Sequence, residues 1–446
     1  MKKTLLSLLL SFISIGLFGQ TKEQKLDELL SAYHKLNSFN GTALVSERGK
    51  ILLNKGYGYK NVENKESNES ETIFQIGSIT KQFTSTVILK LEEEGKLLLT
   101  DKISKYFPDF PDGNRITVYN LLTHTSGIFN YTNDGEFMKS EALKPTTESK
   151  IIALFKDKKL DFEPNSKYNY SNSNYMLLGY IIQKVTGKPY ENVVREYIFN
   201  PLQMTKSGFD FVRLNDPNKA TGYFAIGENI TQKSTLVDSS VSFAAGAIYT
   251  TSGDLFKWHS GLLSNKIVKR ETIEKAFTPF KSKYGLGWNI DSLNGKKVLA
   301  HGGGIFGFNA NFARIEQDDI SIVLLNNVGN PKLSDITKDI FSILYDKPYK
   351  IPKVKKEIKV DEEILKKYIG TYEIVPQFKI NVTVESGTLQ AQATGQPKFE
   401  LFAEKDNYFF VKVVEAEVEF VNNEKGETEL LYLYQGGKKI PAKKVN

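Results

Sequence analysis

Cysteine is absent from this chain of 446 residues, and histidine occurs only four times. Without cysteine the chain forms no disulfide and offers no attachment site for a bacterial lipoprotein anchor. The histidines are dispersed along the chain, at His34, His124, His259 and His301. Ligand spacings for zinc or iron cannot be assembled from them. We therefore expect no metal. No cofactor is expected either, because residues 302–307 fit the dinucleotide pattern G-x-G-x-x-G but residues 308–315 alternate like a strand where that site requires a helix.

Long apolar runs are also scarce. One lies at the start of the chain, after Lys2 and Lys3, and ends at the small residue Gly19 before a polar segment. It is too short to span a bilayer comfortably, and no later run reaches membrane length. The pattern predicts a cleaved export signal over residues 1–19. We expect a protein without a membrane anchor, in the periplasm or outside the cell.

The formal charge of +7 is not concentrated in one patch. The densest lysine run, residues 350–359, surrounds Pro352 and has no interleaved aromatic residues. This composition favours a solvated linker over a nucleic-acid surface, so we expect no nucleic-acid partner. With 40% hydrophobic and 12% aromatic residues, the chain can bury large cores and form two or three domains.

One serine, Ser78, is followed three residues later by a lysine, Lys81, where a helical pattern begins. Apolar residues then recur every four positions to about Glu94, at Ile79, Phe83, Val87 and Leu91. Side chains three apart on a helix are neighbours, and the helix N-terminus would stabilise an oxyanion. An N-cap serine beside a solvated lysine is the simpler alternative for such a pair on its own. Other segments of the sequence must decide between this alternative and a catalytic pair.

Two downstream segments have the groups that a Ser-x-x-Lys hydrolase needs for proton transfer and for seating an acyl oxygen. Tyr170 and Asn172 lie in a polar loop before an apolar helix, and His301 opens a run of three glycines that ends at Gly304. The Tyr-x-Asn spacing also occurs at Tyr59, Tyr131 and Tyr190. A loop held on a rigid helix favours Tyr170. Ordinary packing of a tyrosine and a structural histidine are the alternatives.

These segments together resemble the serine β-lactamase and penicillin-binding-protein-like hydrolases. The branch in question holds class C β-lactamases, D-alanyl-D-alanine carboxypeptidases, D-aminopeptidases and family VIII esterases. The resemblance covers about residues 27–345, with further collinear stretches at residues 121–128, 162–164, 244–254, 284–288 and 301–308.

The resemblance implies a role for each matching residue. Ser78 would be the acyl-forming nucleophile. Lys81 and Tyr170 would be the base and proton-transfer pair, with Asn172 as an orienting hydrogen-bond partner. An amine removes a hydroxyl proton at neutral pH only if its pKa is lowered, which burial would do for Lys81.

The glycine-rich strand carries the other implied contacts. The backbone N–H groups of Ser78 and Gly304 would form the oxyanion hole, and His301 and Gly303 would lie at the substrate. Many members of the family carry a lysine where His301 stands, whereas histidine is mostly neutral at neutral pH. This departure favours esters, amides or D-amino-acid peptides over carboxylate-bearing β-lactams.

The order of predicted elements indicates an α+β fold. A hairpin over residues 41–58, a helical middle, strands over 284–327 and a helix near 334–344 are typical of a transpeptidase-like antiparallel sheet flanked by helices, with an all-α lobe. This hydrolase domain would occupy residues 20–345, followed by a linker over residues 346–361. Short alternating runs then predict a small, lipocalin-like antiparallel β-barrel over residues 362–446. These runs lie at residues 380–384, 389–393, 399–402, 408–414 and 418–421.

These features predict an exported serine hydrolase that cleaves a small-molecule or peptide substrate through an acyl-enzyme on Ser78. It would be an esterase, a D-aminopeptidase or a D-Ala-D-Ala carboxypeptidase-like enzyme. The alternatives are a non-catalytic sensor that binds penicillin or wall fragments, and a scaffold in which the barrel binds the partner. Turnover of a simple ester distinguishes the enzyme from the sensor. The sequence indicates no oligomeric state.

Overall fold

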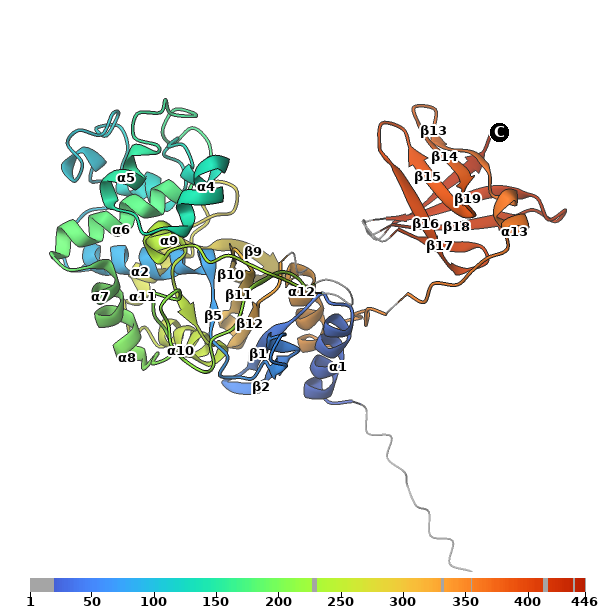
Figure 1. The fold of residues 1–446 in the computed structure, drawn as a ribbon. Coiled ribbons are helices and arrows are strands. Elements are labelled where there is room, and N and C mark those ends of the chain that lie inside the picture. The colour runs from blue at the N-terminus through green and yellow to red at the C-terminus, as the bar shows by residue number, and fades with distance from the viewer. Residues whose placement is uncertain are drawn as a thin grey trace, which may run out of the picture. The chain divides into compact units, whose positions relative to one another are not determined.

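The structure is a computed structural model that describes residues 20–226, 231–329, 333–353, 355–411, 416–435 and 438–445. Contacts divide the chain into two units, Met1–Pro352 and Lys353–Asn446 (Figure 1). The division falls within the predicted linker, and the predicted export signal, residues 1–19, lies outside the described residues. Among the described residues, no helix is long and apolar enough to cross a membrane.

A six-stranded antiparallel sheet organises the first unit, in the order β2-β1-β12-β11-β10-β9. Its strands are β1 (Gly41–Glu47), β2 (Lys50–Tyr57), β9 (Asn289–Leu293), β10 (Lys296–Ile305), β11 (Phe308–Ile315) and β12 (Ile320–Asn326). Segments far apart in sequence meet inside the sheet, because β1 pairs with β12 from Gly41↔Asn326 to Ser46↔Ser321. The predicted hairpin at residues 41–58 is confirmed by the pairing of β1 with β2.

Both faces of the sheet are covered, which explains why every residue of β12 is buried. Successive side chains of a strand point to opposite faces. Ile322 packs in a core with helices α1 (Lys22–Lys35) and α12 (Leu333–Leu344), which lie together beside β1 in Figure 1. The next residue, Val323, packs in the larger core that the sheet shares with the helical lobe.

Helices dominate the chain between β2 and β9. They are α2 (Thr80–Glu93), α3 (Val118–Leu122), α4 (Gly135–Ser140), α5 (Glu148–Ala153), α6 (Asn172–Thr186), α7 (Tyr190–Val194), α8 (Asn200–Leu202), α9 (Ser239–Gly246), α10 (Ser252–Leu263) and α11 (Arg270–Ala276). Short helical turns are η1 (Gly77–Ile79), η2 (Ile103–Lys105), η3 (Tyr131–Asn133), η4 (Glu141–Leu143), η5 (Arg195–Phe199) and, between β11 and β12, η6 (Glu316–Asp318). Short strands pair locally, namely β3 (Tyr59–Asn61) with β4 (Glu66–Ser67), β5 (Phe74–Gln75) with β8 (Tyr249–Thr250), and β6 (Tyr223–Ile226) with β7 (Thr231–Lys233). The predicted combination of an antiparallel sheet with a helical lobe is confirmed.

The second unit is a closed antiparallel barrel of eight strands. They are β13 (Gly370–Val375), β14 (Phe378–Glu385), β15 (Thr388–Ala393), β16 (Lys398–Lys405), β17 (Tyr408–Phe410), β18 (Ala416–Asn422), β19 (Thr428–Gln435) and β20 (Lys438–Lys444), preceded by α13 (Glu362–Lys367). Apolar side chains fill its core, where Tyr368 stacks on Phe420 with ring centroids 4.3 Å apart. The predicted barrel is confirmed. The predicted strand run over residues 408–414 partly falls outside the described residues.

Candidate active site

Ser78 lies in the turn that leads into the central helix of the lobe. It belongs to η1, just before α2 begins at Thr80, so it precedes the helix rather than starting it. Neither η1 nor α2 has a side-chain cap hydrogen bond. The Ser78 hydroxyl therefore does not act as an N-cap, which was the simpler alternative for this residue.

Strand β10 approaches this turn closely, and two glycines make the approach possible. Gly77 has a φ of +50°, and a Cβ there would lie 2.8 Å from the backbone N and O of Gly304. A Cβ at Gly303 would lie 1.9 Å from the carbonyl oxygen of Ile76 and 3.2 Å from the backbone N of Ser78. A side chain at either position would push β10 away from the turn. The approach places the predicted oxyanion groups on adjoining segments.

Lys81 is fully buried, and its amine contacts three oxygens. Its Nζ lies 3.0 Å from Ser78 Oγ, 2.8 Å from Asn172 Oδ1 and 2.8 Å from the carbonyl oxygen of Ala245. Burial lowers the pKa of Lys81 well below its usual range. The amide and carbonyl oxygens can only accept, so a neutral amine donates to both and turns its lone pair toward Ser78. Lys81 is thus placed to take the hydroxyl proton.

Tyr170 reaches Ser78 from the loop that precedes α6. Its hydroxyl lies 2.8 Å from Ser78 Oγ, to which it can donate. Burial raises the pKa of Tyr170 above its ordinary value, so the phenol keeps its proton at neutral pH. Tyr170 is therefore placed to give a proton rather than to act as a tyrosinate base.

The other tyrosines with the Tyr-x-Asn spacing have different partners. The Tyr131 hydroxyl donates to the carbonyl oxygen of Val241 at 2.6 Å. The Tyr190 hydroxyl shares a hydrogen bond of 2.7 Å with Thr84. Tyr59 is 42% exposed on the short strand β3. Among these four tyrosines, the contact with Ser78 belongs to Tyr170.

Asn172 is fixed by contacts that the sequence did not indicate. Its Nδ2 donates to Thr132 Oγ1 at 3.0 Å, and its backbone N–H donates to Asn130 Oδ1 at 2.9 Å. These bonds direct the amide oxygen at Lys81. The third partner of the lysine, the carbonyl of Ala245, comes from α9, in the stretch at residues 244–254.

His124 received no role from the sequence, yet its ring packs on Tyr170 with centroids 4.3 Å apart. Its Nδ1 accepts the backbone N–H of Ser171 at 3.2 Å. Burial lowers the pKa of His124 well below 6.5, so this nitrogen remains an acceptor. The φ of +55° is uncommon for a residue other than glycine. His124 holds the loop that carries Tyr170, and its one signal in the sequence was its place in the stretch at residues 121–128.

His301 is buried beside this cluster and is not among the residues that line the cavity over Ser78. Its Nδ1 lies 2.6 Å from the carbonyl oxygen of Gly302, and its Nε2 lies 3.0 Å from the Tyr284 hydroxyl. A carbonyl only accepts, so Nδ1 donates and Nε2 accepts from Tyr284. Burial lowers the pKa of His301 to about 4, so the ring is neutral at neutral pH. The predicted role of His301 at the substrate stays a prediction.

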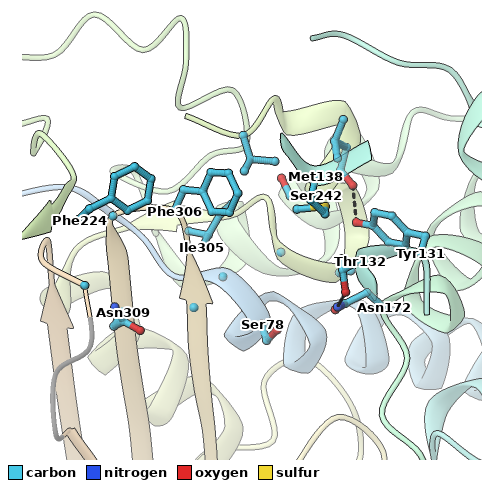
Figure 2. Close-up of a pocket in the computed structure, with 18 residues that line it drawn as sticks. Ser78, Tyr131, Thr132, Met138, Asn172, Phe224, Ser242, Ile305, Phe306 and Asn309 are labelled. Carbon is cyan, nitrogen blue, oxygen red and sulfur yellow. Dashed lines mark hydrogen bonds between the residues drawn. The ribbon is translucent and has the colours of Figure 1, made fainter. Parts of the chain in front are cut away.

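A cavity of about 410 Å³ opens over Ser78 (Figure 2). Of the predicted site residues, Ser78, Asn172 and Gly304 line it, whereas Lys81 and Tyr170 contact Ser78 from outside the lining. The apolar lining side chains are Tyr131, Met138, Phe224, Val237, Val241, Ala245, Ile305 and Phe306. The described residues that line it include no acidic, basic or histidine side chain. Among the described residues, no group of three or more histidine, cysteine or acidic side chains could hold a metal ion.

Comparison with known proteins adds an independent line of evidence. Residues 26–344 match the family model described as Beta-lactamase, and residues 354–443 match a domain of unknown function, DUF3471. The putative penicillin-binding protein PbpX of Bacillus subtilis is 35% identical over 329 residues, which cover 73% of this chain and 80% of that protein.

Solved structures resemble the chain as well. The octameric penicillin-binding protein homologue from Pyrococcus abyssi superposes with a TM-score of 0.68 at 27% identity, covering 94% of this chain and 99% of that one. A D-stereospecific amidohydrolase from a Streptomyces species gives a TM-score of 0.62 at 25% identity, covering 71% and 98%. The family model takes in the sheet, the helical lobe and Ser78 alike, so the chain belongs to the β-lactamase family, together with homologues of penicillin-binding proteins.

Proposed function

We propose that this protein is an exported serine hydrolase that cleaves a neutral ester or amide through an acyl-enzyme on Ser78. The observation that carries the proposal is the position of Ser78 Oγ, 3.0 Å from the amine of Lys81 and 2.8 Å from the hydroxyl of Tyr170. A serine hydroxyl becomes nucleophilic when a neighbouring base takes its proton. Here a base with a lowered pKa and a separate proton donor contact the same oxygen.

In the proposed reaction, Lys81 takes the hydroxyl proton as Ser78 Oγ attacks the substrate carbonyl. The backbone N–H groups of Ser78 and Gly304 stabilise the oxyanion that forms. Tyr170 gives its proton to the departing alcohol or amine and recovers one from Lys81. Water then attacks the acyl-enzyme, releases the acid and restores the Ser78 hydroxyl.

The absence of charged side chains among the described lining residues supports a neutral substrate. A carboxylate brought into the cavity would find no cationic side chain among the described lining residues, and the His301 ring is neutral and occupied by Gly302 and Tyr284. Burying an unpaired charge is costly, which disfavours carboxylate-bearing β-lactams and peptide C-termini. The similarity to a D-stereospecific amidohydrolase supports amides, alongside esters, as the bond cleaved.

Covalent labelling tests the proposal. Intact-mass measurement after treatment with a fluorophosphonate should show one adduct on the wild type and none on Ser78→Ala, which should also lose ester turnover. Ser242→Ala is a matched control, because Ser242 lines the same cavity but no lysine contacts it in the described structure. Labelling that persists in Ser78→Ala would refute the assignment. An adduct without turnover of any ester would instead favour the non-catalytic sensor.

A further inference from the structure

The cavity extends to both sides of Ser78, and its sheet side ends in two phenylalanines. Phe224 belongs to β6, and Phe306 lies in the turn between β10 and β11. Their ring centroids are 6.0 Å apart with planes inclined at 60°, an edge-to-face pair. Figure 2 shows both rings near the strand ends, with Tyr131 and Met138 on the other side of Ser78.

This aromatic pair forms an apolar surface that is open on one side, where Phe224 is exposed, and rests on the large core on the other, against which Phe306 packs. Phe224 is 42% exposed, and Ile305 and Phe306 next to it are half-buried. The three side chains are contiguous with the cavity over Ser78. Single exposed apolar side chains are ordinary, but a contiguous apolar surface that continues into a cavity is typical of a ligand-binding site.

The backbone holds both phenylalanines in place. The Tyr223 N–H donates to the carbonyl oxygen of Asn327 at 3.0 Å, and the Gly329 N–H donates to that of Tyr223 at 2.9 Å. The Phe306 turn packs directly on Ser234, because a Cβ at Gly307 would lie 2.1 Å from Ser234 Oγ. A surface that is fixed before binding loses little conformational entropy when a ligand arrives.

Charge further restricts what this surface can hold. A terminal ammonium needs an acidic partner and a terminal carboxylate needs a basic one, and the described lining residues offer neither. The nearby amine of Lys81 is already bonded to Asn172 and Ala245 and faces Ser78. Apolar side chains lie on both sides of the nucleophile, at Tyr131 and Met138 as well as at the phenylalanine pair.

We propose that Phe224 and Phe306 form an aromatic subsite for an uncharged apolar or aromatic group of the substrate. The inference rests on the proposed function and narrows its substrate class. The substrate is an ester or a blocked amide with apolar groups on both sides of the scissile bond. Peptides with a free amino or carboxyl terminus next to that bond are poor substrates.

The test uses the full chain and a set of four neutral esters, in which the acyl part is acetyl or phenylacetyl and the alcohol part is methyl or benzyl. The measured quantity is the ratio of kcat/KM between an ester with a phenyl group and the matching ester without it. In Phe224→Ala and in Phe306→Leu this ratio should fall about tenfold for either the acyl part or the alcohol part, whichever contacts the phenylalanine pair. Phe280→Ala is the matched control. Phe280 is 39% exposed and pairs edge-to-face with Tyr119 at 5.5 Å, outside the cavity lining.

A second comparison addresses charge. The methyl ester of N-acetyl-D-phenylalanine should be cleaved faster than the same ester with a free amine, and a preference for the free amine would overturn the charge argument. Equal loss on all four esters, or an equal effect of Phe280→Ala, would overturn the aromatic subsite. A changed molecular mass of Phe224→Ala in light scattering, with an unchanged ester preference, would also overturn it and identify a contact between copies.

Fluorophosphonate labelling of each variant distinguishes a failure of the aromatic subsite from a failure of the proposed hydrolase function. Labelling at Ser78 with an unchanged ester preference overturns the subsite and leaves the proposed function standing. A wild-type protein that neither labels nor cleaves any of the esters overturns both.

Discussion

At the scale of single residues, one physical cause gives Lys81 and Tyr170 complementary tasks. Removal from water disfavours the charged form of any side chain. It therefore lowers the pKa of the Lys81 ammonium and raises the pKa of the Tyr170 phenol. A neutral amine and a neutral phenol then meet at Ser78 Oγ, one able to accept a proton and the other able to donate one.

This division of tasks predicts the effect of removing one hydroxyl. Tyr170→Phe should lower kcat by about 10²–10⁴-fold, the usual range for a positioned proton-transfer group, without unfolding the protein. Tyr131→Phe is the control, because Tyr131 has the same Tyr-x-Asn spacing but bonds to Val241. The measurement is kcat for one neutral ester in each variant. A large loss in Tyr131→Phe with a small one in Tyr170→Phe would reverse the assignment.

The lowered pKa of His301 predicts that the free energy of unfolding depends on pH. Its pKa is lowered from 6.5 to about 4 by burial, so between these values the unfolded chain binds more protons than the folded one. The contribution of His301 to the free energy of unfolding therefore keeps its full value above about pH 6.5 and decreases as the pH falls toward about 4. At about pH 5 the loss should be on the order of 2 kcal/mol.

Denaturant unfolding at about pH 7.5 and about pH 5 measures this loss. His301→Gln should show a smaller decrease between the two conditions than the wild type does, because its side chain does not titrate. Equal decreases in the two proteins would mean that the ring is already protonated in the folded state.

At the scale of elements, the site depends on the contact between β10 and η1. Two segments separated by more than 200 residues in sequence lie closer than any side chain would allow. The strand is fixed from its other edge by β11, with Gly303 paired with Ala310 and Gly304 with Asn309. This pairing fixes the position of the β10 backbone relative to Ser78.

Neighbouring glycines of β10 should respond differently to the same substitution. Gly303→Ala places a Cβ 1.9 Å from the Ile76 carbonyl oxygen, so the strand must shift and kcat/KM should fall by about 10²-fold. Gly302→Ala meets no atom nearer than 3.9 Å and has no positive φ, so it should keep nearly full activity. Ester kinetics and thermal unfolding of both variants check this. Equal losses of kcat/KM in the two variants would mean that the close approach of Gly303 to Ile76 is not the cause of the effect.

At the scale of the whole molecule, each unit has a core of its own. The barrel closes on itself and is filled by Tyr368, Tyr372, Phe409 and Phe420 among other apolar side chains. The first unit retains Tyr349 and Ile351, which pack against the core beneath the sheet. A self-contained core on each side of the division is what independent folding requires.

This arrangement predicts that residues 20–352 fold and act without the barrel. The truncated protein should unfold cooperatively and keep most of the ester activity of the full chain. Ending the chain at Tyr345 instead should lower stability, because it removes Tyr349 and Ile351. Circular dichroism melting and kcat for one ester compare the three proteins. Aggregation or inactivity of residues 20–352 would show that the barrel completes the site or an assembly.

The limits of the sequence pattern are visible in the barrel. The alternating runs at residues 380–384, 389–393, 399–402 and 418–421 fall within β14, β15, β16 and β18. The pattern did not locate β19, whose Leu-Leu-Tyr-Leu-Tyr run does not alternate. It also did not locate β20, which contains Pro441 and four lysines, residues disfavoured in strands. Barrel closure gives these two strands partners despite their composition.

What the sequence determined by itself is local. Ser78 and Lys81 are three residues apart, so the first turn of one helix is enough to bring them together. The hairpin at residues 41–58 and the helix to Glu93 likewise follow from short-range periodicity.

What only the tertiary structure decided depends on contacts between distant segments. Sequence context favoured Tyr170 among four tyrosines of equal spacing, but its contact with Ser78 exists only because α6 packs beside α2 and brings that loop to the serine. The tertiary structure added the carbonyl of Ala245 and the ring of His124, whose roles arise from position and burial rather than from residue type. It also assembled the cavity, whose described lining residues carry no charged side chain, from β6, β10, α4 and α9. Short-range pattern cannot encode such a surface, since its members adjoin only after the chain has folded.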